Sequence, residues 1–277
     1  ASSSFRGTAM LINARPPAVA GSFYPGDPAT LSATVERLLA DADAVPGIQP
    51  KALIVPHAGY VYSGSTAATA YATLAPWAKT IRRVILLGPT HRVAVDGIAL
   101  PEAEVFSTPL GPIRLDAQAI AAIAELPQIV FSDHVHAFEH SLEVHLPFLQ
   151  RVLAQFTLVP LAVGHATPEA VADVLERLWD GPETLIVVSS DLSHFLPYST
   201  AQQVDSNTCR HILQLDTHIN PEQACGAYPI NGLLLAARRR GLTPALLGLC
   251  NSGDTAGDKN RVVGYAAFSF TEAGHHA

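Results

Sequence analysis

Lys51-Ala-Leu-Ile-Val-Pro-His57 and Arg83-Val-Ile-Leu-Leu-Gly-Pro-Thr-His91 each run from an apolar, β-branched segment into a histidine. A third run, Thr184-Leu-Ile-Val-Val-Ser-Ser190, is followed by Asp191-Leu-Ser-His194. Each run has the length and composition of a strand that is buried on both faces. In an open α/β sheet, ligands bind beyond the carboxyl ends of the strands. The repeated histidines therefore predict a metal or proton-transfer site at that edge.

The rest of the 277-residue chain alternates between strand-like and helix-like segments. Helices are expected to begin at Asp27-Pro28, at about 141 and at Thr167-Pro168, and to extend over about 64–75, 199–214 and 229–240. Further strands are expected at 97–100, 156–163, 245–250 and 261–270. A hairpin is expected around 109–112. This alternation predicts one α/β domain over residues 15–272, with a mixed, mostly parallel central sheet that helices flank on both faces. Residues 1–14 are expected to form a disordered or irregular leader, and the proline-rich stretch 15–25 an irregular arm.

Composition excludes several functional classes. The formal charge of −7 argues against a nucleic-acid or anionic-membrane surface, because phosphate binding requires clustered Lys and Arg. No apolar stretch reaches the roughly 18 residues of a membrane span. The three cysteines, Cys209, Cys225 and Cys250, are far apart and form no C-x-x-C pair, which is typical of a reducing compartment. The sequence thus predicts a cytoplasmic protein.

A second group of titratable residues lies in Glu139-His140-Ser-Leu-Glu143-Val-His145. His140 and Glu143 are three residues apart and would share one face of a helix. A first-turn glutamate can also simply complement the helix dipole, and His145 can simply be packed. A single histidine at a strand end could be explained by a hydrogen bond that it makes to the backbone. Several histidines at equivalent strand ends favour a metal or proton-transfer site instead.

Two further segments come after strands and contain carboxylates. A Ser-His-Asp hydrolase is disfavoured around Asp191 and His194 because no G-x-S-x-G elbow is present, so Asp191 is expected to orient or tune an imidazole. Asp254 lies in a polar, glycine-rich segment that is either a tight turn or a ligand loop. Two histidines and one carboxylate would match the ligand set of non-haem Fe(II) sites, and zinc hydrolases use the same ligand types.

Several motifs together resemble those of the MEMO family, known in prokaryotes as AmmeMemoRadiSam system protein B. The matching segments run in order over about 15–270: Arg15-Pro-Pro-Ala-Val-Ala-Gly-Ser-Phe-Tyr-Pro, Pro56-His-Ala-Gly-Tyr-Val-Tyr-Ser-Gly, Leu87-Gly-Pro-Thr-His, Phe106-Ser-Thr-Pro-Leu-Gly, Glu139-His-Ser-Leu-Glu-Val-His-Leu-Pro-Phe, Val188-Ser-Ser-Asp-Leu-Ser-His, Asn251-Ser-Gly-Asp and Val263-Gly-Tyr-Ala-Ala. The family is similar in fold to LigB-type class III extradiol dioxygenases. The resemblance therefore implies a central sheet flanked by helices and a metal pocket.

The resemblance also assigns roles to individual residues. It implies that His57 and His91 are metal ligands, that His194 is an acid–base group and that His140 belongs to the pocket. Human family members place a cysteine ligand in the loop before the final strand, and a gapless match places Thr255 there, next to Asp254. We therefore expect Asp254 as the third ligand, with Fe(II) as the cofactor and Zn or Cu as alternatives.

Three functional hypotheses result from these assignments. The first is an O2-dependent oxygenase or dioxygenase that acts on a small catechol-like or enolisable substrate, with His194, Asp191 and His140 as proton-transfer groups. Tyr60, Glu143, His145 and Thr255 are then expected to bind the substrate. The second is a non-enzymatic metal- or peptide-binding scaffold, for which the resemblance implies AMMECR1-domain and radical SAM proteins as partners. The third is a zinc-dependent hydrolase.

Overall fold

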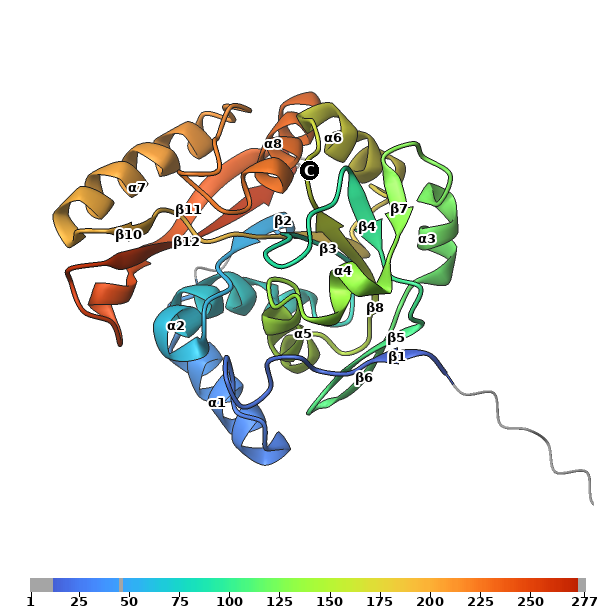
Figure 1. Cartoon of the computed structure of the whole chain (residues 1–277), viewed down its shortest axis with the longest axis horizontal. Coiled ribbons are helices and arrows are strands. Elements are labelled where there is room, and N and C mark those ends of the chain that lie inside the picture. Colours follow the sequence, from blue (N-terminus) through green and yellow to red (C-terminus); the bar gives the residue numbers. More distant parts are fainter. Residues whose placement is uncertain (1–11, 45–46, 274–277) are drawn as a thin grey trace, which may run out of the picture.

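In the computed structural model, which describes residues 12–44 and 47–273, nine strands form one mixed sheet (Figure 1). Its centre consists of four parallel strands in the order β2 (Pro50–Val55), β9 (Thr184–Ser189), β3 (Arg83–Pro89) and β8 (Thr157–Val163). Every residue of β2 and β9 is buried, which explains their continuous apolar runs. Because β2, β9 and β3 are neighbours and parallel, the segments after them meet at one edge of the sheet.

Shorter strands extend this centre on both sides. On one side β12 pairs antiparallel with β2, and β10 and β11 pair with β12; on the other side β4 pairs antiparallel with β8, and β7 pairs with β4. A separate small sheet has the order β1-β5-β6. The bounds of these strands are β1 (Ala14–Arg15), β4 (Ile98–Leu100), β5 (Val105–Thr108), β6 (Gly111–Arg114), β7 (Ile129–Phe131), β10 (His194–Leu196), β11 (Thr243–Asn251) and β12 (Val262–Thr271).

Helices cover both faces of the sheet and enclose two apolar cores. One core includes Leu31, Tyr71 and Leu149, from helices that lie below the sheet in Figure 1, and the other includes Leu175 and Leu234, from helices that lie above it. The helices of the first face are α1 (Pro28–Asp41), α2 (Tyr60–Tyr71) and α5 (Leu146–Val152), and the others are α3 (Ala117–Ile123), α4 (Asp133–Ala137), α6 (Pro168–Arg177), α7 (Tyr198–Leu213) and α8 (Ala227–Arg240). Short 3₁₀ turns occupy Ala72–Trp77, Glu143–His145 and Ser252–Asp254.

The predicted α/β domain with a parallel centre and flanking helices is confirmed. Asp27 and Thr167 cap α1 and α6 as predicted, each accepting a backbone N–H with its side chain. The prediction of a helix from about 141 is wrong, since α5 begins at Leu146 after a 3₁₀ turn. The arm is not wholly irregular, because β1 pairs with β5. Most of the predicted leader, residues 1–11, lies outside the described residues.

Within the part of the chain that the structure describes, no helix combines the length and the apolar character that a membrane crossing requires.

Candidate metal centre

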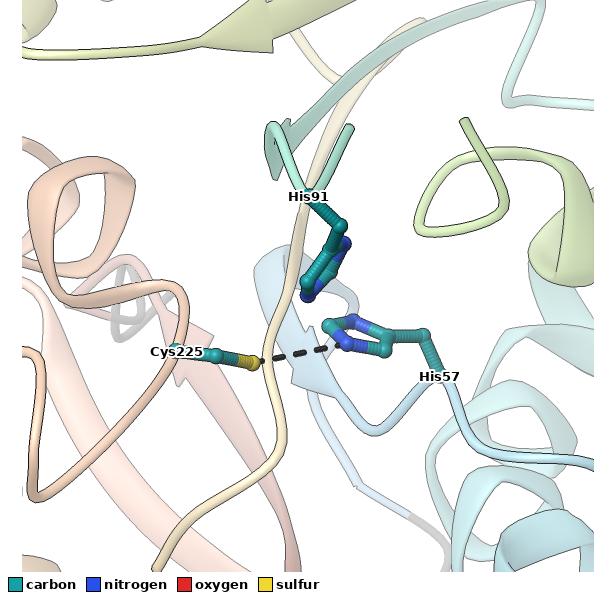
Figure 2. A group of neighbouring side chains, drawn as sticks. All are labelled: His57, His91 and Cys225. Carbon is teal, nitrogen blue, oxygen red and sulfur yellow. Dashed lines mark hydrogen bonds between the residues drawn. The ribbon is translucent and has the colours of Figure 1, made fainter. Parts of the chain in front are cut away.

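Three potential metal ligands converge at the carboxyl edge of the sheet: His57, His91 and Cys225 (Figure 2). His57 comes after β2, His91 comes after β3, and Cys225 lies in the loop before α8. One ligand atom from each residue lies within 4.8 Å of the other two, and His57 Nε2 is 3.4 Å from Cys225 Sγ. Nitrogen and sulfur ligands of a tetrahedral ion such as Zn²⁺ are about 3.5 Å apart. The residues present therefore fit a metal ion.

A buried hydrogen-bond network fixes the orientation of His57. The hydroxyl of Ser189 donates to the carbonyl oxygen of Ser141, 2.6 Å away, so its oxygen is left to accept. The Nδ1 atom of His57 lies 2.7 Å from this oxygen and must donate its hydrogen to it. A neutral imidazole that carries its hydrogen on Nδ1 has a free electron pair on Nε2. The network thus prepares His57 Nε2, the atom nearest Cys225, as a ligand.

The same serine binds a second imidazole. His145 Nε2 is 2.7 Å from Ser189 Oγ and donates to it, and His145 Nδ1 then accepts from the hydroxyl of Tyr71 at 2.8 Å. Burial lowers the pKa of His145 to about 3, so the neutral form assumed by this scheme is the stable one. His145 is 1% exposed, and both of its nitrogens are occupied. His145 therefore supports the orientation of His57 indirectly, because both imidazoles bind the hydroxyl of Ser189.

His91 is oriented by Glu139. Its Nδ1 lies 2.9 Å from Glu139 Oε2, and its backbone N–H donates to Oε1 of the same carboxylate. Burial acts to raise the pKa of Glu139, but hydrogen bonds from His91 and Ser141 outweigh it and lower the pKa to about 2. A carboxylate that accepts from Nδ1 leaves Nε2 free for a metal. The His91 side chain is 29% exposed, so this potential ligand is in contact with solvent.

Asp191 and His194 lie beside the three ligands. Together with Cys225 they form a second group whose ligand atoms are within 4.8 Å of one another. Asp191 Oδ1 accepts the backbone N–H of His57 at 2.8 Å, while its Oδ2 is 3.7 Å from His57 Nε2. Burial raises the pKa of Asp191 to about 7, and burial also lowers the pKa of His194. The predicted pair of proton-transfer groups is thus next to the proposed ion.

His140 forms an aromatic wall of the centre. Its ring stacks on His91 and on Phe23, with centroid separations of 4.6 Å in both cases, and lies 5.4 Å from the ring of His57. Burial, with a smaller contribution from the nearby His91, lowers the pKa of His140 to about 4. The ring is therefore neutral near pH 7. Phe23 belongs to the N-terminal arm, which the sequence did not connect with the site.

Sequence reasoning missed Cys225 as a potential ligand. The residue after it, Gly226, lies so close to β9 that an added Cβ would be 2.6 Å from the Ser189 carbonyl oxygen. This close approach brings Cys225 to the ends of the strands. Burial raises the pKa of the Cys225 thiol to about 12, and a bound metal ion would remove that proton. The Cys-Gly pair immediately before a helix was the only local signal.

Asp254, predicted as the third ligand, is not among the groups of potential ligands that surround His57 and His91 in the described chain. Its Oδ2 accepts the backbone N–H of Asn251 at 2.9 Å, and its Oδ1 accepts the hydroxyl of Tyr198. Thr255 is exposed and donates its hydroxyl to the carbonyl of Tyr62. Asp254 instead completes the cap of a 3₁₀ turn, and Cys225 is the third potential ligand beside His57 and His91.

The other predicted substrate-binding residues are engaged in the core. Glu143 is fully buried, and its two carboxylate oxygens accept from Arg15, from Tyr24 and from the backbone N–H groups of residues 18 and 19. Tyr60 is 8% exposed and donates its hydroxyl to the carbonyl oxygen of Val144. With His145 bound to Ser189 and Tyr71, the polar groups of all three residues already have partners within the protein. Their contacts assign them to structural support.

We expect Ser189→Ala to weaken metal binding by roughly 10- to 100-fold, the usual range for losing a partner that orients a ligand. The change removes the oxygen that fixes the hydrogen on His57 Nδ1. Ser193→Ala is the matched control, because the buried Ser193 hydroxyl has no hydrogen-bond partner among the described residues. Competition titration against a chromophoric chelator measures both affinities. Equal affinities in the two variants would show that the network does not prepare His57.

We also expect metal affinity to rise with pH, by about tenfold per unit between about pH 7 and 9, because binding displaces one proton. The proton comes from Cys225, whose pKa burial raises to about 12. His57 contributes none, because burial lowers its pKa well below the ordinary value. Calorimetric titrations in two buffers of different ionisation enthalpy count the released protons. Release of none would mean that the thiol is not a ligand.

Comparisons with known proteins place the chain among relatives of similar sequence and fold. A family described as Memo-like protein matches residues 15–269. The MEMO1 family protein of Ignicoccus hospitalis is 35% identical, over 94% of this chain and 99% of that protein, and the one of Aquifex aeolicus is 34% identical, over 94% and 100%. Among solved structures, the uncharacterized protein JW3007 from Escherichia coli K12 covers 79% of this chain and 98% of its own, with a TM-score of 0.51 and 12% identity. This last likeness concerns the fold alone.

Proposed function

The chain belongs to the Memo-like protein family, and we propose that it is a mononuclear metal protein in which His57, His91 and Cys225 hold the ion. One observation supports this most strongly: three ligand atoms meet within 4.8 Å at the carboxyl edge of the sheet. Both histidines are bound through Nδ1, to Ser189 and Glu139, so both are oriented to offer Nε2. Such support of the ligands is typical of metal sites.

We propose Fe(II) as the working metal. Imidazole is a ligand for iron, copper and zinc, and a thiolate binds the softer of these ions well, so the donor set accepts all three. Three protein ligands leave coordination positions open for small molecules, as catalytic sites require. Zn²⁺ has no redox chemistry, whereas Fe(II) would supply electrons for reduction of O2. The adjacent proton-transfer groups are suited to such a reaction.

The chain's own residues would then bind and protonate a small substrate. His194 and Asp191 are next to Cys225, where they can take a proton from a catechol-like or enolisable molecule and return it later. His140 and Phe23 form a stacked wall that would exclude water from one side. The partly exposed His91 marks the open side through which the molecule would enter. The activity supported best is therefore O2-dependent oxidation of a small molecule.

Oxygen consumption tests this activity. Protein loaded anaerobically with Fe(II) is mixed with O2 and a panel of catechols and enols, and an electrode monitors O2. We expect sustained consumption, above that of free Fe(II), with at least one compound. Protein loaded with Zn²⁺ is the matched control, because the same ligands then hold an ion without redox chemistry. Equal rates for the Fe(II) and Zn²⁺ forms across the panel would contradict the proposed activity.

A further inference from the structure

A cavity lies at the opposite end of the sheet from the metal centre. It has a volume of about 600 Å³ and is lined by residues of β6, by the segment after α5 and by the first residue of β8, a region that can be located in Figure 1. Arg82 immediately precedes β3, whereas His91 lies beyond the end of that strand. Seven residues of parallel strand span roughly 20 Å. The cavity is therefore separate from the proposed metal site.

The floor of this cavity is apolar. Leu110, Ile113, Leu153 and Phe156 line it, and each also packs against the core that α1, α2 and α5 form with the sheet. A volume of several hundred cubic ångströms, lined by apolar side chains together with polar groups, is typical of sites for small organic molecules. The cavity is suited to an aliphatic or aromatic body.

Two arginines that form no ion pair among the described residues line the same cavity. Arg82 and Arg114 both line it and are exposed, and neither forms an ion pair within the described residues. Their neighbours differ in this respect, since Arg83 binds Asp116 and Asp180, and Arg151 binds Glu36. Guanidinium groups bind carboxylates and phosphates through paired N–H donors.

We propose that this cavity binds a small amphipathic anion, with its apolar body on Leu110, Ile113, Leu153 and Phe156 and its anionic head at Arg82 and Arg114. Ligands of this class have one acidic head group attached to an apolar body. Long-chain carboxylic acids and phosphate monoesters both meet this description. The site is independent of the metal centre, so either proposal can fail without the other.

Calorimetric titration with three eight-carbon probes tests the proposal: octanoate, octyl phosphate and octan-1-ol. We expect saturable one-to-one binding of at least one anion and binding of the alcohol at least about tenfold weaker, since charge-assisted hydrogen bonds are lost. The tighter of the two anions identifies the head group. Binding of the alcohol as tight as that of both anions, or no saturable binding of either anion, would overturn the proposal.

Variants locate the binding. The double variant Arg82→Gln/Arg114→Gln is expected to bind the preferred anion about tenfold more weakly or worse, while Arg210→Gln, an exposed arginine on α7, should change nothing. Ala154→Trp places a large side chain in the cavity from an exposed position and should abolish binding. Fe(II) affinity should stay unchanged in all of them. Wild-type binding in both the double variant and Ala154→Trp would refute the assignment.

Discussion

Cys225→Ser should lower Fe(II) affinity by about 100-fold or more, because a protein thiolate is replaced by a hydroxyl that stays protonated near neutral pH. The thiol lies 3.4 Å from His57 Nε2, and the substitution leaves the residues that orient His57 and His91 unchanged. The variant should also lose the proton release expected on metal binding. Anaerobic titration of the apo-protein with Fe(II), in competition with a chelator, measures the change.

Two control variants test whether the loss of Fe(II) affinity is specific to Cys225. Cys250→Ser changes another free cysteine, whose thiol contacts the Thr66 hydroxyl, and should leave the Fe(II) affinity within about threefold of wild type. Asp254→Asn removes the carboxylate that the sequence suggested as a ligand and should have an equally small effect. A large loss in Asp254→Asn together with wild-type binding in Cys225→Ser would restore the carboxylate to the ligand set.

Glu143→Gln should destabilise the protein by roughly 3–5 kcal/mol, because it leaves a buried arginine without its counter-charge. Glu143 is fully buried, and its partner Arg15 is 6% exposed; their closest atoms are 2.8 Å apart. The same carboxylate accepts from the N-terminal arm at residues 18 and 19, so the arm should loosen as well. Urea unfolding monitored by circular dichroism gives the free energy of unfolding.

Glu36→Gln is the matched control, since it breaks another Glu–Arg pair, with Arg151, at the surface. Both partners of that pair are more than a third exposed, and solvent-exposed ion pairs contribute about 0–1 kcal/mol. A difference of less than about 1 kcal/mol between the two variants would mean that Glu143 does not anchor the buried arginine and the arm.

The parallel centre of the fold could be predicted because burial on both faces leaves a direct mark in the sequence. The runs that end before His57, His91 and Asp191 are continuous and apolar, and the structure makes them adjacent strands. The carboxyl ends of parallel strands lie at one edge of a sheet, so the histidines and the aspartate just beyond those ends must lie at the same edge. The proximity of these residues could therefore be predicted from the strand topology alone, without any knowledge of side-chain contacts.

The third ligand and the role of Glu143 could not be predicted in this way. Cys225 reaches the strand ends through a loop packed against β9, and nothing periodic in the sequence marks that packing. Glu143 lies among titratable residues, but the arginine that neutralises it is 128 positions away. A charged residue near a site has the same appearance in a sequence whether it meets a substrate or a distant counter-charge. Only the tertiary contacts distinguish the two.

We propose that His57, His91 and Cys225 together hold one metal ion. Anomalous diffraction at the metal edge, on crystals of protein loaded with Fe(II) or Zn²⁺, tests it most directly. We expect one strong peak about 2.3 Å from Cys225 Sγ and about 2.0–2.1 Å from one nitrogen of each histidine. A peak bound instead to the Asp254 carboxylate, or no peak among these three residues, would contradict the claim.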